Sequence, residues 1–193
     1  MDALRVSALR EALAGTGWPE CAREFGGELR RAVARGPFGG LLLVGTTGYE
    51  PWHLAAHLDE QARWSGAAAL APVLLRRSIP PGAPAHLAHG LERLVERPRG
   101  ATVLVVAPGA ADEVLLERVQ DARRGGATVL ALDDGEPQWA STAHQRLTVP
   151  GVGAEPFDLI QHLVGAAAGA RPRRGPRLGR LAGLLTGRPA PRW

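Results

Sequence analysis

The chain has 193 residues, of which 45% are hydrophobic and 22% charged, so it can bury the core of one domain and is too apolar for wholesale disorder. Its 23 basic and 19 acidic residues give a formal net charge of +4. The single cysteine, Cys21, excludes an intrachain disulfide and a zinc site built from several thiolates. The longest apolar stretch, residues 67–75, is far shorter than the roughly 20 residues that cross a bilayer. The N-terminus has no apolar segment typical of a secretion signal, so we expect a cytoplasmic protein without a membrane span.

Two helices are predicted at the start of the chain. Residues 4–13 favour a short helix, and the glycines at 15 and 17 end it. A longer helix begins near Pro19, which suits a first helical turn, and ends at Gly36. Its apolar stripe, at a spacing of four residues, is predicted to be Cys21, Phe25, Leu29 and Val33.

Short apolar runs then alternate with helical patterns. The predicted strands are residues 41–44, 69–75, 102–107, 128–132 and 146–149. The predicted helices are residues 50–65, 84–96, 112–124 and a last one that begins at Pro156. In the last three helices the predicted inward positions are Leu87, Leu91, Leu94, Val95, Val114, Leu115, Val119, Leu159, Ile160, Leu163 and Val164. The sequence Gly-Ala-Thr-Val-Leu begins at both Gly100 and Gly126, which indicates two strands in equivalent environments.

This alternation predicts a three-layer, doubly wound α/β sandwich with a five-stranded parallel sheet and right-handed crossovers. Ligands of such sheets bind at the carboxyl ends of strands, near helix N-termini. Three turns qualify, at residues 45–50, 107–112 and 133–137. The last two carry Asp112 and Asp133, whose carboxylates cap a helix or hold a cation.

The first of these turns, residues 45–48, is the best candidate for an anion site. Gly45 lets backbone approach a ligand, Thr46 and Thr47 supply hydroxyl donors, and the next helix adds its positive end. A tight turn between strand and helix needs the same glycines without any ligand, so both interpretations stay open. The turn is neither a Walker A loop nor a complete dinucleotide-binding fingerprint.

His53 and His57 lie four residues apart, on one face of the helix that follows. That spacing can bind a metal, but the pair lacks the glutamate of a His-Glu-x-x-His site. Surface or interface histidines are therefore favoured, and we expect neither a metal nor a cofactor.

Residues 100–169 resemble the second half of sugar isomerase (SIS) domains. The resemblance rests on RRGGATVLAL at 123–132, WASTAH at 139–144 and FDLIQHLVG at 157–165. Residues 41–66 are similar to the first strand, loop and helix of these domains, so the likeness covers most of residues 20–169.

The resemblance implies a phosphosugar site and a homodimer. The ligand-binding residues that it implies are Gly45, Thr46, Thr47, Gly48, Tyr49 and Gly109. The second loop of the family carries serines and a threonine, and here Ala107, Gly109 and Asp112 stand in their places, so a carboxylate would repel a phosphate. No catalytic residue of the family carries over, and Glu50, His53 and His57 are candidates by position alone.

The positive charge is concentrated at the end of the chain. Residues 171–193 hold seven Arg, four Pro and no acidic residue, so the rest of the chain carries 16 basic and 19 acidic residues. We predict an N-terminal helix in residues 1–18, an SIS-like α/β domain at 19–170 and a flexible basic tail at 171–193.

Two hypotheses for function follow from these observations. In the first, the chain is a divergent SIS-like protein that binds a sugar phosphate or a related anionic carbohydrate derivative without full isomerase activity. In the second, it is a dimeric interaction or regulatory protein whose tail binds nucleic acid or an acidic partner.

Overall fold

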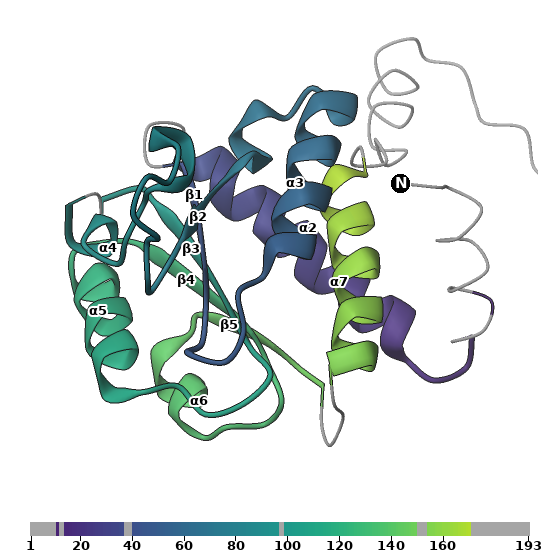
Figure 1. Ribbon diagram of the computed structural model, residues 1–193. Helices are drawn as coiled ribbons and strands as arrows, with labels where there is room; N and C mark the ends of the chain where they lie inside the picture. Colours follow the sequence, from purple (N-terminus) through teal and green to yellow (C-terminus); the bar gives the residue numbers. More distant parts are fainter. Residues whose placement is uncertain (1–10, 12–13, 37–39, 97–98, 150–153, 171–193) are drawn as a thin grey trace, which may run out of the picture.

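A parallel sheet of five strands, in the order β2-β1-β3-β4-β5, forms the centre of the structure (Figure 1). This computed structural model describes residues 11, 14–36, 40–96, 99–149 and 154–170. The strands are β1 (Leu41–Gly45), β2 (Pro72–Leu75), β3 (Thr102–Ala107), β4 (Thr128–Asp133) and β5 (Gln145–Thr148). The strand order reverses between β1 and β3, so the carboxyl ends of these two strands form the crevice where ligands of such sheets bind.

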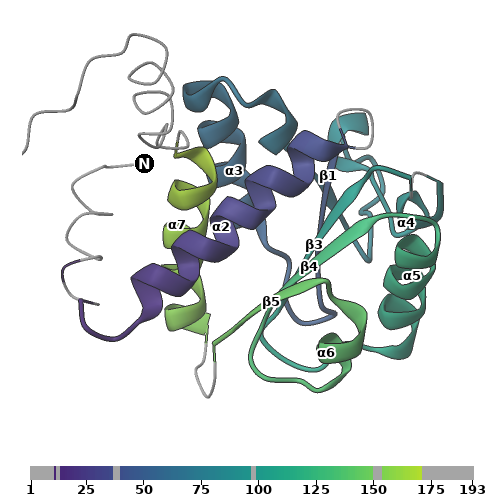
Figure 2. The ribbon, with the colours of Figure 1, turned by 180° about the vertical axis from the view of Figure 1, so that it is seen from behind.

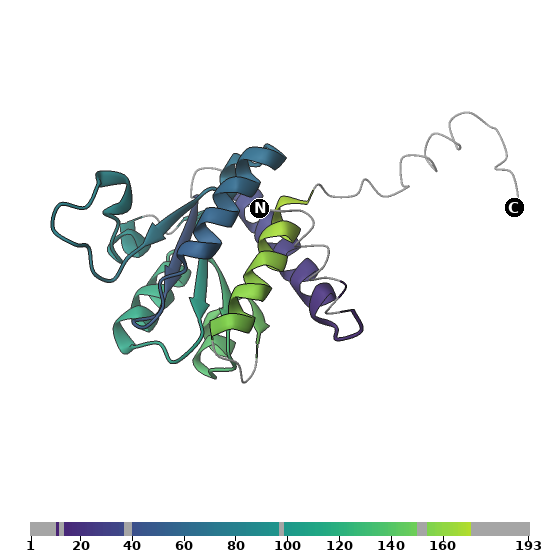
Figure 3. The ribbon, with the colours of Figure 1, turned by 45° about the vertical axis from the view of Figure 1, so that its right-hand side comes forward.

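Helices cover both faces of the sheet. The helices α2 (Trp18–Arg35), α3 (Trp52–Ser65) and α7 (Ala154–Gly169) lie on one face, and α4 (Arg93–Glu96), α5 (Glu113–Arg124) and α6 (Gln138–Thr142) lie on the other (Figures 1 and 2). The edge-on view in Figure 3 separates the layers and shows α3 beside α7. Each face has its own cluster of buried apolar side chains. The predicted doubly wound three-layer α/β sandwich is therefore confirmed.

The central strands are buried on both faces, as their unbroken apolar sequences predict. Every residue of β1 and β3 is buried. The repeated Gly-Ala-Thr-Val-Leu segments pair in register, with Thr102 opposite Thr128 and Leu104 opposite Leu130 in neighbouring parallel strands. The repetition thus reflects two central strands in equivalent surroundings.

Four predicted inward positions are wrong. Cys21 is exposed, because a strict spacing of four residues drifts around a helix that has 3.6 residues per turn. The buried face of α2 instead consists of Ala22, Phe25, Gly26, Leu29, Ala32 and Val33. Val95, Val114 and Leu159 are also exposed, each adjacent in sequence to a buried residue that takes the inward direction.

Three predicted elements differ from the structure in their extent. The helix expected at residues 84–96 is split into a 3-10 turn, Ala85–Leu87, and the short α4. The reason is that Gly90 pairs with Arg76, the residue that follows β2, and the carbonyl oxygen of His89 accepts a hydrogen bond from Arg76 N–H. The strand expected at residues 69–75 begins with a 3-10 turn, Ala68–Leu70. Helix α6 lies where a loop was expected.

Two predictions fall on residues outside the described part of the chain, namely most of the helix at 4–13 and the whole tail at 171–193. Among the residues that are described, every helix is too short or too polar to cross a bilayer.

Candidate functional site

The turn after β1 is closed by its own backbone. Tyr49 N–H donates a hydrogen bond of 3.1 Å to the carbonyl oxygen of Thr46. A Cβ atom at Gly45 would lie 1.8 Å from the carbonyl oxygen of Tyr49, so only glycine fits there. The turn geometry alone therefore explains Gly45. Around Gly48 and Gly109, by contrast, a Cβ atom would meet open space.

Only part of this turn faces solvent. Thr47 and Gly48 are exposed, whereas Thr46 is buried. The Tyr49 side chain points to α7, where its hydroxyl donates to Asp158 Oδ1 at 2.9 Å and accepts from Gln161 Nε2 at 2.7 Å. Burial raises the pKa of the Tyr49 hydroxyl to about 12. Thr46 and Tyr49 thus support the turn from within, and of its two hydroxyl-bearing threonines only Thr47 faces outward.

The carboxylate of Asp112 accepts the hydrogen bonds of the donors around Thr47. Its carboxylate accepts a hydrogen bond of 2.6 Å from Thr47 Oγ1 and one of 2.9 Å from Arg77 Nη1. It also caps α5 by accepting from Leu115 N–H at 3.0 Å. Burial acts to raise the pKa of Asp112, but these donors outweigh it and hold the pKa below its usual value. At neutral pH a charged carboxylate of the chain itself therefore lies where an anionic ligand was expected.

Glu50 is held by two neighbours. Arg76 Nε lies 3.2 Å from Glu50 Oε2, and Trp52 Nε1 donates to the same oxygen at 2.8 Å. The guanidinium of Arg76 also stacks over the Trp52 ring, 5.2 Å from its centre. The helix begins at Trp52 with Pro51 as its cap, two residues later than the predicted start at residue 50, so Glu50 lies just before its N-terminus. Glu50 acts here as the centre of a surface cluster.

His53 and His57 meet a third histidine, His162 of α7. The Nε2 atom of His53 lies 2.9 Å from Nε2 of His162 and 3.0 Å from Nε2 of His57. Burial, followed by the charges of His162 and His53, lowers the pKa of His57 to about 4, so this ring is neutral at pH 7. The spacing of His53 and His57 predicts that they share one helical face, but no sequence pattern indicates that α7 brings a third histidine beside them.

The turn after β4 is closed by an ion pair. Asp133 is fully buried and accepts hydrogen bonds from Arg146 Nε at 2.9 Å, Arg146 Nη2 at 2.6 Å and Gly135 N–H at 2.8 Å. Both carboxylate oxygens are thus occupied. The structure gives Asp133 an internal cation, Arg146, in place of the metal ion considered from the sequence.

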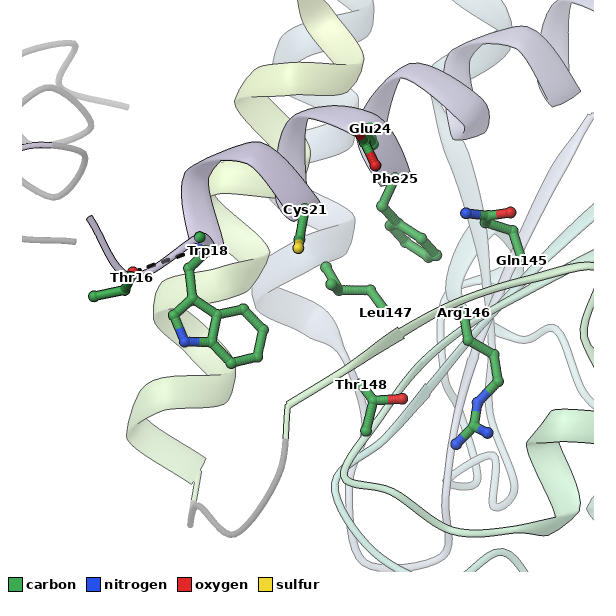
Figure 4. Close-up of a pocket in the computed structure, with 10 residues that line it drawn as sticks. Thr16, Trp18, Cys21, Glu24, Phe25, Gln145, Arg146, Leu147 and Thr148 are labelled. Carbon is green, nitrogen blue, oxygen red and sulfur yellow. Dashed lines mark hydrogen bonds between the residues drawn. The ribbon is translucent and has the colours of Figure 1, made fainter. Parts of the chain in front are cut away.

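Two surface pockets lie away from the turn after β1. One, of about 410 Å³, lies between the start of α2 and the edge strand β5 (Figure 4). Trp18, Cys21 and Phe25 of α2 line it on one side, and the β5 residues line it on the other. A second pocket, of about 520 Å³, lies between α3, β2 and the segment 86–89. Neither includes Thr47, Asp112 or the three histidines.

Comparison with known proteins identifies the fold. No protein-family model matches the sequence, and no curated protein matches it either. Among solved structures, the chain is similar to the sugar isomerase domain of an RpiR transcription factor from Sphaerobacter thermophilus, with a TM-score of 0.54 and 17% sequence identity. The match covers 84% of this chain and 86% of the other. The chain therefore has an SIS-like fold, in a divergent sequence, as the resemblance implied.

Proposed function

We propose that the chain is a divergent SIS-like module that binds a sugar phosphate, or a related anionic carbohydrate derivative, without isomerising it. The observation that carries this proposal is the convergence of Thr47 Oγ1, Arg77 Nη1 and Leu115 N–H on one carboxylate at the crevice between β1 and β3. A hydroxyl, a guanidinium and a helix N-terminus are the donors that bind phosphate in other proteins. The similar structure belongs to a transcription factor, so a domain of this fold also occurs outside isomerases.

We propose binding without turnover because the carboxylates nearest to the turn are already held by hydrogen bonds. A general base must lie within hydrogen-bond reach of the proton that it removes. Glu50 is held by Arg76 and Trp52, and Asp112 is held by three donors. The structure therefore favours binding over proton transfer at this edge of the sheet.

Binding requires the ligand to displace Asp112 from Thr47 and Arg77. A phosphate dianion about 4 Å from a carboxylate in a solvated site is repelled by about 2 kcal/mol, which weakens binding about thirtyfold. The substitution Asp112→Asn removes this charge and keeps an equally good helix cap. We expect it to tighten the binding of hexose 6-phosphates by about this factor.

The test is isothermal titration calorimetry of the full chain with hexose 6-phosphates, the unphosphorylated hexoses and inorganic phosphate. Wild type, Asp112→Asn and Thr47→Val are compared with the control variant Thr148→Val, since Thr148 lies on β5, away from the turn. Thr47→Val should weaken binding, and Thr148→Val should leave it unchanged. If no sugar phosphate binds even to Asp112→Asn, the proposal is wrong.

The second candidate is a dimeric interaction or regulatory protein. The observation that favours it is the composition of residues 171–193, with seven Arg and no acidic residue. Binding to nucleic acid through this tail would weaken steeply with salt and disappear on deletion of residues 171–193. We also propose a homodimer, which sedimentation of the full chain and of the deletion variant tests directly.

A further inference from the structure

Three imidazole rings from two helices converge on one point of the surface. His53 and His57 are one turn apart on α3, and His162 lies on α7, which packs beside α3 (Figure 3). One nitrogen from each ring can be chosen so that all three lie within 4.8 Å of one another. The two helices lie close together here, since a Cβ atom at Gly165 of α7 would lie 3.4 Å from Cβ of His57.

Hydrogen bonds between the three rings cannot account for all of the close nitrogen contacts. The Nε2 atom of a neutral imidazole carries either one hydrogen or one in-plane lone pair. His53 Nε2 is within 3.0 Å of the Nε2 atoms of both His57 and His162, so one of these contacts is left without a proper hydrogen bond. Additional protonation would place positive charges side by side. A cation that accepts all three lone pairs removes this conflict.

We propose that His53, His57 and His162 bind a divalent transition metal ion, most simply zinc, with a fourth position open to solvent. This site goes beyond the proposed ligand-binding function and shares no residue with it. Zinc–nitrogen bonds of about 2.0–2.1 Å in a tetrahedral site place the nitrogens about 3.3 Å apart. The observed separations of 2.9 and 3.0 Å, from His53 to the other two rings, lie close to that value, and all three nitrogens lie within 4.8 Å of one another.

The surroundings suit such a site. Glu60 Oε2 lies 3.9 Å from Nδ1 of His57, on the side of the ring away from the cluster. At that distance the carboxylate makes no hydrogen bond to the ring, but its negative charge favours a cation at the cluster. His53 is exposed, which gives an ion access from solvent. A set of three imidazoles selects zinc, nickel, copper or cobalt over calcium and magnesium, which prefer oxygen ligands.

The experiment uses the full chain after removal of metal with a chelator. Zinc is titrated by calorimetry, and cobalt(II) is titrated by visible absorption, whose intensity reports tetrahedral coordination. We expect one ion per chain, and a loss of affinity of about a hundredfold or more in His162→Gln. The control is His86→Gln, an exposed histidine outside the cluster, which should bind as wild type does.

Folding is checked for each variant by circular dichroism. If His162→Gln fails to fold, the exposed residue His53 provides the second variant, His53→Gln, with the same expected loss. Fewer than one ion per wild-type chain, or unchanged affinity in the folded cluster variants, would overturn the proposal.

Discussion

The contact between α2 and α7 depends on the absence of one side chain. Gly26 lies on the buried face of α2. A Cβ atom at this position would lie 2.6 Å from Cβ of Ala167, 2.8 Å from the carbonyl oxygen of Val164 and 2.9 Å from the backbone nitrogen of Ala168. Two of these atoms belong to the α7 backbone, so no side-chain rotation relieves the clash. The substitution Gly26→Ala must therefore push the helices apart.

The next residue provides a matched control. At Gly27 a Cβ atom would have only Arg31 Nη1 nearby, at 3.6 Å, which is an ordinary contact. Both substitutions gain about 1 kcal/mol of helix propensity. Overpacking costs about 1–3 kcal/mol, and the backbone clashes at Gly26 place it near the upper end. We expect Gly26→Ala to lose about 2 kcal/mol of unfolding free energy and Gly27→Ala to gain about 1 kcal/mol.

Urea unfolding followed by circular dichroism measures both free energies, and thermal unfolding provides a second readout. In a chain of this size the expected Tm changes are roughly −4 to −8 °C for Gly26→Ala and +2 to +4 °C for Gly27→Ala. If both alanine variants are stabilised to the same extent, α2 and α7 do not cross as closely as the structure shows, and the reasoning fails.

Three further changes test the electrostatics and hydrogen bonds of the fold. Arg146→Met leaves the buried Asp133 carboxylate unpaired and should cost about 3 kcal/mol in urea unfolding, with partial recovery in Arg146→Lys. In metal-free protein, the folded-state pKa of His57 near 4 lies below its unfolded value of 6.5, so this residue should lower stability as pH falls from about 6.5 to 4. The loss, about 2 kcal/mol after allowance for solvent screening, should be absent in His57→Gln when unfolding is measured across that range. Tyr49→Phe removes the hydrogen bonds to α7 that support the turn after β1, and it should cost about 1 kcal/mol of unfolding free energy in urea unfolding.

The sequence predicts the sheet better than it predicts the helices. Strands β1 and β3 are continuous apolar runs buried on both faces, so their composition determines their place. The buried face of a helix is harder to predict, because neighbouring residues in a helix point in different directions. Val114 is exposed, for example, whereas the next residue, Leu115, is buried. The prediction of one helix at residues 84–96 was wrong because a tertiary contact, the pairing of Gly90 with Arg76, outweighed the local pattern.

The candidate sites show the same limit. Sequence spacing places Thr47 and Asp112 at the same edge of the sheet, but it does not reveal that their side chains bond to each other. It puts His53 and His57 on one helical face, whereas the contribution of His162 depends on how α7 packs beside α3. Each missed contact joins residues more than 60 positions apart, where local patterns carry no information.

Helix α7 supports both sites. It holds the turn after β1 through the hydrogen bonds of Tyr49 to Gln161, and the adjacent residue His162 completes the histidine cluster. Gly26→Ala displaces α7 at Val164 and Ala168 without touching a histidine.

We therefore expect Gly26→Ala to weaken zinc binding about tenfold at a temperature where the variant remains folded. Changes in the residues that position a metal ligand lower metal affinity by about this factor in other proteins. Gly27→Ala, on the outer side of the same helix, should bind zinc as wild type does. Calorimetric titration of the two variants decides the point. Equal affinities would show that the displacement of α7 caused by Gly26→Ala does not reach His162.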